Sequence, residues 1–218
     1  MDSVSGVGVI DKAVVLLRAL RDSPADLAGL QQACGLPRAT THRLLVALEK
    51  HHLVRRDGQG RFCLGFEFVA YGRAAGEQFA LAELAGPVLT RLRDESGESV
   101  QLYVREDDAR RCVVSLQSPH GLRWIVPVGS SLPLDVGSAG RVLGRADLPA
   151  GWVESVEERE PGVASVSAAV QDGSGRVVAA VSISGPVERL TRSPGDRFGA
   201  AVMAAASELS AALARFGG

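Results

Sequence analysis

The chain has 218 residues, is 46% hydrophobic and carries a formal net charge of −1 at pH 7, so it can hold one large or two small domains with hydrophobic cores. No apolar run of about 18 residues occurs, and the N-terminus lacks the pattern of a signal peptide, which argues against membrane insertion and secretion. We therefore expect a cytoplasmic protein. Its cysteines, Cys34, Cys63 and Cys112, match no C-x-x-C spacing and are expected to be reduced core residues.

The charge is unevenly distributed along the chain. Residues 1–65 hold nine Lys or Arg against six Asp or Glu, whereas residues 66–218 hold fifteen against nineteen. This asymmetry favours two domains, of which the first is the more basic.

The first predicted helix has an apolar stripe of five residues at helical spacing, namely Ile10, Ala13, Val14, Leu17 and Leu20. The glycines at positions 6 and 8 do not form a dinucleotide-binding fingerprint, because no strand precedes them and the third glycine of the motif is missing. We therefore expect no cofactor.

A helix-turn-helix is predicted between residues 26 and 50. Asp26 can cap a helix over residues 27–34, and Gly35 can end it in the left-handed conformation. Pro37 then opens a second helix, because a proline in the first turn has no hydrogen bond to lose. The four residues 34–37 thus form the turn between two helices.

The second helix of this pair is amphipathic. Thr41, Leu44, Leu45 and Leu48 share one face, which is predicted to be core. The polar residues elsewhere on the helix are of the types that contact DNA bases and phosphates, and these are Arg38, Thr40, His42 and Arg43. An ordinary surface helix with solvated charges is the alternative.

A hairpin follows, and it favours the DNA-binding interpretation. Two strands, residues 53–56 and 61–64, flank the turn at residues 57–60, which is rich in residues that accept a positive φ. Arg55, Arg56 and Arg61 lie on or beside it as a basic wing. Because the excess of positive charge is modest, affinity for DNA would depend on dimerisation and on where the charges lie.

Beyond the wing, residues 66–78 carry Phe66, Val69 and Ala70 at helical spacing together with several small residues. We expect a linker helix that also forms a dimer contact, with a mere spacer as the alternative. A further helix is expected over residues 81–95.

The remainder alternates between strand and helix patterns. Strands are predicted at residues 99–105, 111–116, 124–128, 163–170 and 177–184, with a loop at 129–137, a short helix at 138–146 and a long last helix starting at Ser193-Pro194. The exposed N–H groups at the start of the short helix favour an anion. The order of elements suits an α+β arrangement, in which helices pack beside an antiparallel sheet.

Serines recur in the last two strands. A hairpin centred between Gly173 and Ser174 predicts that Ser165 lies opposite Ser182, with Ser167 and Ser184 on the same face. Buried hydroxyls in apolar strands need hydrogen-bond partners. Either a ligand or the neighbouring backbone and solvent could supply them.

The sequence does not support an enzyme. Three of the four histidines, His42, His51 and His52, fall in the helix-turn-helix, and His120 has no evident partner. Neither G-x-S-x-G nor H-E-x-x-H occurs. A serine without an activating base is not a nucleophile, so we expect no catalytic and no metal-binding residues.

The run GLPRATTHRLLVALEKHHLVRRDGQGRFCLG resembles the N-terminal signature of IclR-type transcriptional regulators, and the similarity continues to AAVSISGP. The resemblance implies a winged helix-turn-helix domain (residues 1–65), a linker helix (66–80) and a GAF-like effector-binding domain (81–218). EREPGVASVSA and SISGPVERLTR resemble the actinobacterial branch typified by NdgR and AreB, which implies control of amino-acid and especially leucine biosynthesis.

The resemblance also implies site residues. Arg38, Thr40 and Arg43 match positions that contact DNA in related regulators, and Thr41, His42 and the wing arginines complete the candidate set. The implied effector-binding residues are Ser138, Ala139, Ser155, Ser165, Ser182 and Ser184. The implied partners are an inverted-repeat DNA operator, a small-molecule effector, and further copies of the chain in a homodimer or a dimer of dimers.

One segment departs from the family pattern. Residues 147–160 are shorter than usual, which puts one wall of the effector pocket in doubt. Two alternatives therefore stay open, namely a regulator with a vestigial pocket that responds to no ligand and a small serine-dependent hydrolase.

Overall fold

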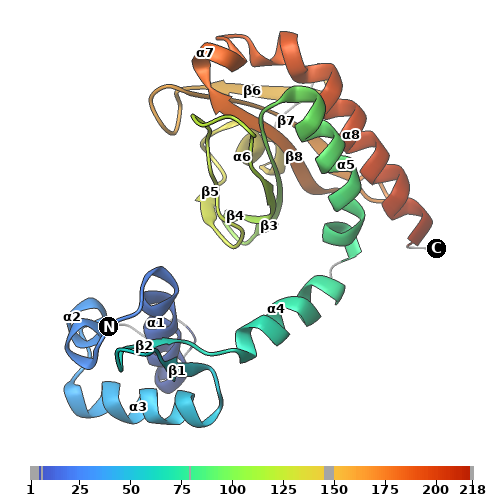
Figure 1. Cartoon of the computed structure of the whole chain (residues 1–218). Helices are drawn as coiled ribbons and strands as arrows, with labels where there is room; N and C mark the ends of the chain where they lie inside the picture. Colours follow the sequence, from blue (N-terminus) through green and yellow to red (C-terminus); the bar gives the residue numbers. More distant parts are fainter. Residues whose placement is uncertain (1–4, 6, 79, 145–149, 217–218) are drawn as a thin grey trace. The chain divides into compact units, whose positions relative to one another are not determined.

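The structure is a computed structural model that describes residue 5 and residues 7–78, 80–144 and 150–216. The chain divides into two compact units, residues 1–78 and residues 79–218 (Figure 1). Each unit has a hydrophobic core of its own. The fold is α+β, as predicted. None of the described helices is long and apolar enough to cross a membrane.

The first unit is a winged helix-turn-helix. Its elements are α1 (Gly8–Asp22), α2 (Leu27–Cys34), α3 (Arg38–Lys50), β1 (Val54–Arg56), β2 (Phe62–Leu64) and α4 (Glu67–Gln78). The predicted limits of α2 are confirmed, because the Asp26 carboxylate accepts from the Gly29 N–H at 2.8 Å and Gly35 has a φ of 63°. α3 begins at Arg38, with Pro37 at the N-cap position.

The core of this unit contains Leu20, Leu30 and Leu45. The predicted stripe of α1 was partly wrong: Leu16 is fully buried, whereas the Ile10 side chain is 54% exposed. The face that packs on α2 and the wing therefore starts one turn later than the apolar pattern suggested, and it leaves Ile10 outside.

Helix α4 is covered by few other residues of the first unit. Residues 69–75 are all exposed, and so are the large side chains of Phe66, Val69 and Tyr71. Phe68 and Tyr71 form an edge-to-face ring pair with centroids 6.4 Å apart. This helix thus presents an apolar surface that the first unit does not bury.

The second unit is a six-stranded antiparallel sheet with helices on both faces (Figure 1). Its elements are α5 (Ala80–Ser96), β3 (Ser99–Glu106), β4 (Ala109–Leu116), β5 (Ser131–Pro133), α6 (Ser138–Leu143), β6 (Trp152–Val156), β7 (Val163–Gln171), β8 (Val177–Pro186), α7 (Val187–Leu190) and α8 (Pro194–Phe216). The strand order is β5-β4-β3-β8-β7-β6.

The alternation of side chains along the strands separates two cores. Leu102 and Ile183 point to the face covered by α5 and α8, where Leu209 completes the larger core. Tyr103 and Ala180 point to the opposite face, which α6 covers. Residues one position apart on a strand thus serve different layers.

Two strand predictions were wrong. Residues 124–128 form no strand, and the edge strand β5 lies instead inside the stretch predicted as a loop. Pro127 lacks the N–H that a ladder needs, which explains why pairing starts only after it. The strand β6 was not predicted, and it lies in the segment that departs from the family pattern. Residues 147–149 of that segment, and residues 145–146 at the predicted end of the short helix, lie outside the described residues.

The edge strand β6 is held to the start of α8. The Glu154 carboxylate accepts from the Gly195 N–H at 2.9 Å, which places a negative charge at the N-terminus of a long helix. The indole of Trp152 packs against Gly195 and Gly199. Because these two glycines lie one turn apart and lack side chains, the large ring can pack directly against the backbone of α8.

The hairpin register differs from the prediction by two residues. Ser165 lies opposite Ser184, and Ser167 lies opposite Ser182. The loop holds five residues closed by the Asp172 N–H to Arg176 carbonyl bond, and a bulge at Val170 shifts the ladder further. The shift is two positions, so all four serines stay on the predicted face.

Candidate DNA-binding surface and candidate ligand cavity

The outer face of α3 carries the predicted DNA-binding side chains. Arg38, His42 and Arg43 are exposed and Thr40 is half-buried. Within the described residues neither Arg38 nor Arg43 forms an ion pair. Both guanidinium groups are therefore available to a phosphate or to a guanine edge.

Thr41 is a correction to the candidate set. Its side chain is fully buried, and its hydroxyl donates to the Pro37 carbonyl oxygen at 3.1 Å. Thr41 therefore fastens the start of α3 to the preceding turn, and its side chain cannot reach DNA in this arrangement.

The three wing arginines differ in how freely they can move. Arg61 is paired with the Asp57 carboxylate, with Nη2 and Oδ2 2.8 Å apart. Arg56 donates to the Gly60 carbonyl oxygen at 3.1 Å and lies 3.5 Å from the Glu49 carboxylate. Arg55 is half-buried and lies over the Phe66 ring.

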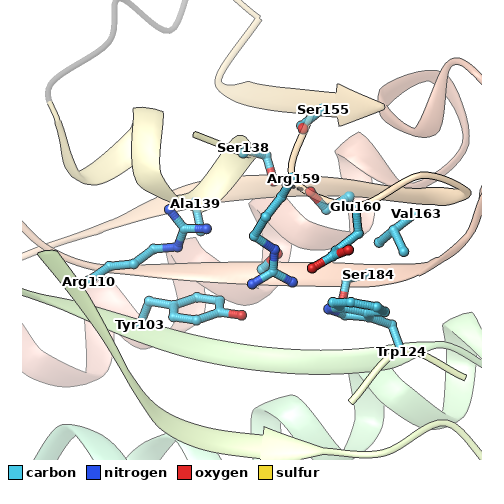
Figure 2. A pocket seen from close by; sticks show the side chains of 13 residues that line it. Tyr103, Arg110, Trp124, Ser138, Ala139, Ser155, Arg159, Glu160, Val163 and Ser184 are labelled. Atoms are coloured by element: carbon cyan, nitrogen blue, oxygen red, sulfur yellow. Dashed lines mark hydrogen bonds between the residues drawn. The ribbon is translucent and has the colours of Figure 1, made fainter. Parts of the chain in front are cut away.

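In the second unit, the six predicted effector-binding residues line one cavity, which we call the serine cavity (Figure 2). They are Ser138 and Ala139 at the start of α6, Ser155 on β6, Ser165 on β7, and Ser182 and Ser184 on β8. The empty space among the lining residues, counted with its open mouth, is about 410 Å³. The floor of the cavity is the sheet face covered by α6.

The sheet register brings serines from four neighbouring strands into one row. Ser155 pairs with Ser165, Ser165 with Ser184, and Ser184 with Ser99. In the next row Ser167 pairs with Ser182, which pairs with Gln101. Directly opposite residues share a face, so these polar side chains form one continuous floor.

Some of these hydroxyls have partners and others have none. Ser138 Oγ lies 2.7 Å from both Ser165 Oγ and Ser167 Oγ. Ser184 Oγ donates to Gln101 Oε1 at 2.8 Å. Within the described residues, Ser155 and Ser182 form no side-chain hydrogen bond, although both are buried. Neither oxygen is among the fully buried atoms without a partner, so both hydroxyls keep accessible surface and can bond to a polar molecule in the cavity.

Sequence reasoning missed the charged and aromatic walls of the cavity. These are formed by Tyr103, Arg110, Trp124, Arg159 and Glu160, with Gly137 and Val163 beside them. Figure 2 shows the side chains of Arg159 and Glu160 directed into the space between Tyr103 and Trp124. Tyr103 could have been predicted, because the alternation along β3 puts it on the sheet face that carries the serines. Trp124 lies in a stretch wrongly predicted to be a strand, and Arg159 lies in the segment that departs from the family pattern.

The two arginines of the cavity have different surroundings. Arg110 is 4% exposed and donates to the carbonyl oxygens of Pro133 and Val136, so it also fastens the loop before α6. Arg159 lies 5.0 Å over the Trp124 ring and forms no ion pair with another described residue. Arg159 therefore offers the cavity a positive charge that no carboxylate of the described chain neutralises.

The cavity also changes the acidity of its walls. Burial lowers the pKa of Arg110, and the nearby charge of Arg159 adds to that effect. Burial raises the pKa of the Tyr103 hydroxyl well above its ordinary value, so Tyr103 stays neutral and can donate a hydrogen bond.

Some hydrogen-bond donors close to this space are unpaired. Gln101 Nε2, Arg110 Nε and Trp124 Nε1 are buried without a hydrogen-bond partner. Glu160 is the lining residue with a carboxylate. The positive charges of Arg110 and Arg159 on the walls suit a molecule that brings oxygen acceptors and a negative charge. None of the four histidines lines the cavity, so its serines lack the base that a hydrolase requires.

Comparison with known proteins defines the class of both units. Residues 9–58 match the family model of the IclR helix-turn-helix domain. Residues 74–150 and 145–211 match that of the bacterial transcriptional regulator IclR C-terminal domain. The chain is 28% identical to the transcriptional repressor IclR of Escherichia coli K12 over 243 aligned positions, which cover 93% of this chain and 89% of that protein. It is 28% identical to the repressor AllR of Salmonella typhimurium, with 95% and 90% covered.

Solved structures share the fold. A transcriptional regulator of Rhodococcus sp. RHA1 superposes with a TM-score of 0.81 at 22% identity, covering 96% of this chain and 99% of that one. An IclR homologue of Microbacterium hydrocarbonoxydans, solved in complex with 4-hydroxybenzoate, superposes with a TM-score of 0.81 at 18% identity, covering 94% and 98%.

A winged helix-turn-helix followed by a curled antiparallel-sheet domain is the architecture of a DNA-binding transcriptional regulator. This chain belongs to the IclR family of such regulators. Its relatives named above are repressors and not enzymes. These relatives do not test the more specific resemblance to the NdgR and AreB branch, which stays a prediction.

Proposed function

We infer that this regulator senses a small polar metabolite in the serine cavity and, in response, changes its affinity for DNA. The observation that carries this proposal is the gathering of six family-predicted residues around one space that Arg110 and Arg159 also line. The resemblance to the NdgR and AreB branch adds that its target genes serve amino-acid biosynthesis, in particular that of leucine. We place this activity in the cytoplasm.

The DNA-reading element of the proposal is α3. Arg38, Thr40, His42 and Arg43 reach base edges and phosphates, and Arg55, Arg56 and Arg61 contact the backbone from the wing. In this scheme residues 1–65 form the DNA-binding domain, residues 66–80 the linker and residues 81–218 the GAF-like sensor domain.

One α3 reads only a few base pairs, so useful specificity requires two. We propose a homodimer, or a dimer of such dimers, on an inverted repeat. The exposed apolar residues of α1 and α4 support this, because Val9, Ile10, Val69 and Tyr71 have no partners that bury them in their own unit.

A ligand can change DNA affinity only through its different affinity for two states of the protein, so sensing and DNA binding must be separable by mutation. The double variant Ser182→Ala/Ser184→Ala should fold, dimerise and bind its operator normally, yet lose the response to the metabolite. Ser115→Ala is the matched control, because Ser115 lies on the same sheet face but does not line the cavity.

The metabolite can be sought by thermal shift with amino acids and small organic acids, since a ligand at 100 times its dissociation constant adds about 2.7 kcal/mol of stability. The competing function is a regulator that ignores ligands. The bonds from Ser138 to Ser165 and Ser167 favour it, because they satisfy part of the floor without a ligand. It would be established if no compound stabilised the wild type. A double variant that kept the full response would instead place the sensing site outside the serine cavity.

A further inference from the structure

The serine cavity has little free space inside it. Its free volume is about 30 Å³, whereas a cavity of about 150 Å³ holds one benzene molecule. The larger figure of about 410 Å³ also counts narrow gaps and the open mouth. A metabolite of comparable size to benzene therefore fits only after part of a wall has moved.

The side chains that take up this space come from one loop. Residues 157–162 join β6 to β7, and we call them the β6–β7 loop. Figure 2 shows two of its side chains, Arg159 and Glu160, directed into the space between Tyr103 and Trp124. The floor of the cavity belongs to paired strands, whereas no residue of the loop is buried. The loop is thus the wall that can move with the smallest loss of contacts.

Glu158 fastens this loop to α6. Its carboxylate accepts from the Gly137 N–H at 3.1 Å and lies 3.0 Å from the Arg141 guanidinium. We call these two contacts the latch. Glu158 does not line the cavity, so it can influence a ligand there only through the position of the loop.

The base of the loop is fixed independently of the latch. The Glu157 N–H donates to the Val163 carbonyl oxygen at 2.8 Å, and the Glu157 carboxylate accepts from the Gly162 N–H at 3.0 Å. The same carboxylate lies 3.0 Å from the Arg192 guanidinium. Opening the latch would therefore free the part of the loop that fills the cavity and leave its base in place.

We propose that the β6–β7 loop is an internal plug of the sensor. With the latch closed, Arg159 and Glu160 occupy the space that a ligand needs, so a ligand binds the protein only when the latch is open. The apparent dissociation constant then equals the intrinsic constant divided by the fraction of protein with an open latch. The latch therefore sets the metabolite concentration at which the regulator responds. This inference rests on the proposed sensor function.

The Trp124 indole gives a readout that needs no ligand. Arg159 lies over its ring, and its Nε1 is buried without a hydrogen-bond partner, so exchange of the Nε1 hydrogen with water is limited by its cover alone. NMR of the 15N-labelled full chain should show this exchange about threefold to tenfold faster in Glu158→Ala than in the wild type. That factor is expected for the loss of one charged hydrogen bond and one partly exposed ion pair.

Two controls separate opening of the loop from loss of stability. The backbone amide of Val181, which is fully buried on the central strand β8, should keep its exchange rate in Glu158→Ala. Glu208→Ala is the matched variant, because it removes an exposed ion pair with Arg91 in the same unit. It should leave both exchange rates unchanged.

Arg141→Gln opens the latch from the other side, and it covers the case in which Glu158→Ala does not fold. It also excludes a simple effect of charge. Removing the negative charge of Glu158 would by itself strengthen the binding of an anion, whereas removing the positive charge of Arg141 would weaken it. With the plug, both variants accelerate the Trp124 exchange. An amino acid or organic acid that stabilises the wild type in the thermal-shift screen should bind both variants more tightly, with a dissociation constant at least about threefold lower in Glu158→Ala.

The plug is overturned if the Trp124 exchange in the folded latch variants equals that of the wild type, or if the Val181 exchange accelerates to the same degree. It is also overturned if a compound that stabilises the wild type binds the latch variants no more tightly. These results leave the sensor function intact. A screen in which no compound stabilises the wild type instead removes the sensor function and this inference with it.

Discussion

The indole ring of Trp152 lies directly against the backbone of Gly195, at the place where a Cβ atom would overlap it. This contact joins the edge strand β6 to the first turn of α8. Because Ser155 follows three positions later on the same strand, the contact also fixes one wall of the serine cavity.

Gly195→Ala should therefore destabilise the second unit by about 1–3 kcal/mol, since the ring or the helix must move to admit the methyl group. Thermal or chemical unfolding followed by circular dichroism measures the change. Ala200→Ser on the exposed side of α8 is the control, and its loss of unfolding free energy should be only a few tenths of the loss in Gly195→Ala. Equal stability of Gly195→Ala and the wild type would show that the ring is not confined by this glycine.

Arg43→Ala should flatten the sequence preference of the protein for DNA. Its guanidinium is exposed on α3, and a bidentate contact to guanine is worth about 1–3 kcal/mol of discrimination. Arg55→Ala on the wing should instead weaken binding to all sequences alike and lower the salt dependence. Binding to an operator selected from random DNA, and to its single-base variants, separates the two effects, with Arg215→Ala on α8 as the control. The same uniform loss for both variants would contradict the assignment of Arg43.

Val69→Glu should dissociate the proposed dimer. The Val69 side chain is 71% exposed on α4, and a carboxylate there would have to be buried in an interface formed by this helix. Leu122→Glu is a matched control, because Leu122 is 70% exposed but lies in the loop between β4 and β5. Sedimentation measures the oligomeric state of both variants. If the Val69→Glu protein is still a dimer, or if the Leu122→Glu protein is a monomer, the interface lies elsewhere.

The turn between β7 and β8 should contribute a pH-dependent stability. The Ser174 hydroxyl, which donates to Asp172 at 2.6 Å, lowers the pKa of the Asp172 carboxyl from 3.8 to about 2, with help from backbone N–H groups and Arg176. A lowered pKa means that this contribution is present above pH 3.8 and is lost as the pH falls toward 2. An NMR titration of Asp172 should report the low pKa, and Ser174→Ala should raise it; an unchanged pKa in that variant would exclude the hydroxyl as the cause.

Apart from the positions implied by the family resemblance, the composition of the site was predictable only where local patterns decide it. The alternation of Ser165, Ser167, Ser182 and Ser184 put all four on one face, and the structure agrees because a two-residue shift of register preserves the face. The pairing itself was wrong by two residues. A five-residue loop and a bulge set it, and neither follows from the glycines alone.

The walls of the cavity were beyond such patterns. Arg159 and Trp124 are remote in sequence, and only the folded chain brings the guanidinium over the ring. Likewise, the packing of β6 depends on glycines in α8, a long-range relationship that strand propensity does not contain. Both examples concern segments whose place in the fold is decided by tertiary contacts.

The sparse covering of α4 has a consequence for its dynamics. A helix of 12 residues is marginal in water when packing does not support it, so the amide hydrogens of residues 69–75 should exchange with solvent almost as fast as those of a free peptide in dilute protein. They should become protected as the concentration rises and a second chain covers Val69 and Tyr71. The order of this helix would then report the assembly state of the regulator. A cell could change how much of the helix is ordered by changing the concentration of the protein.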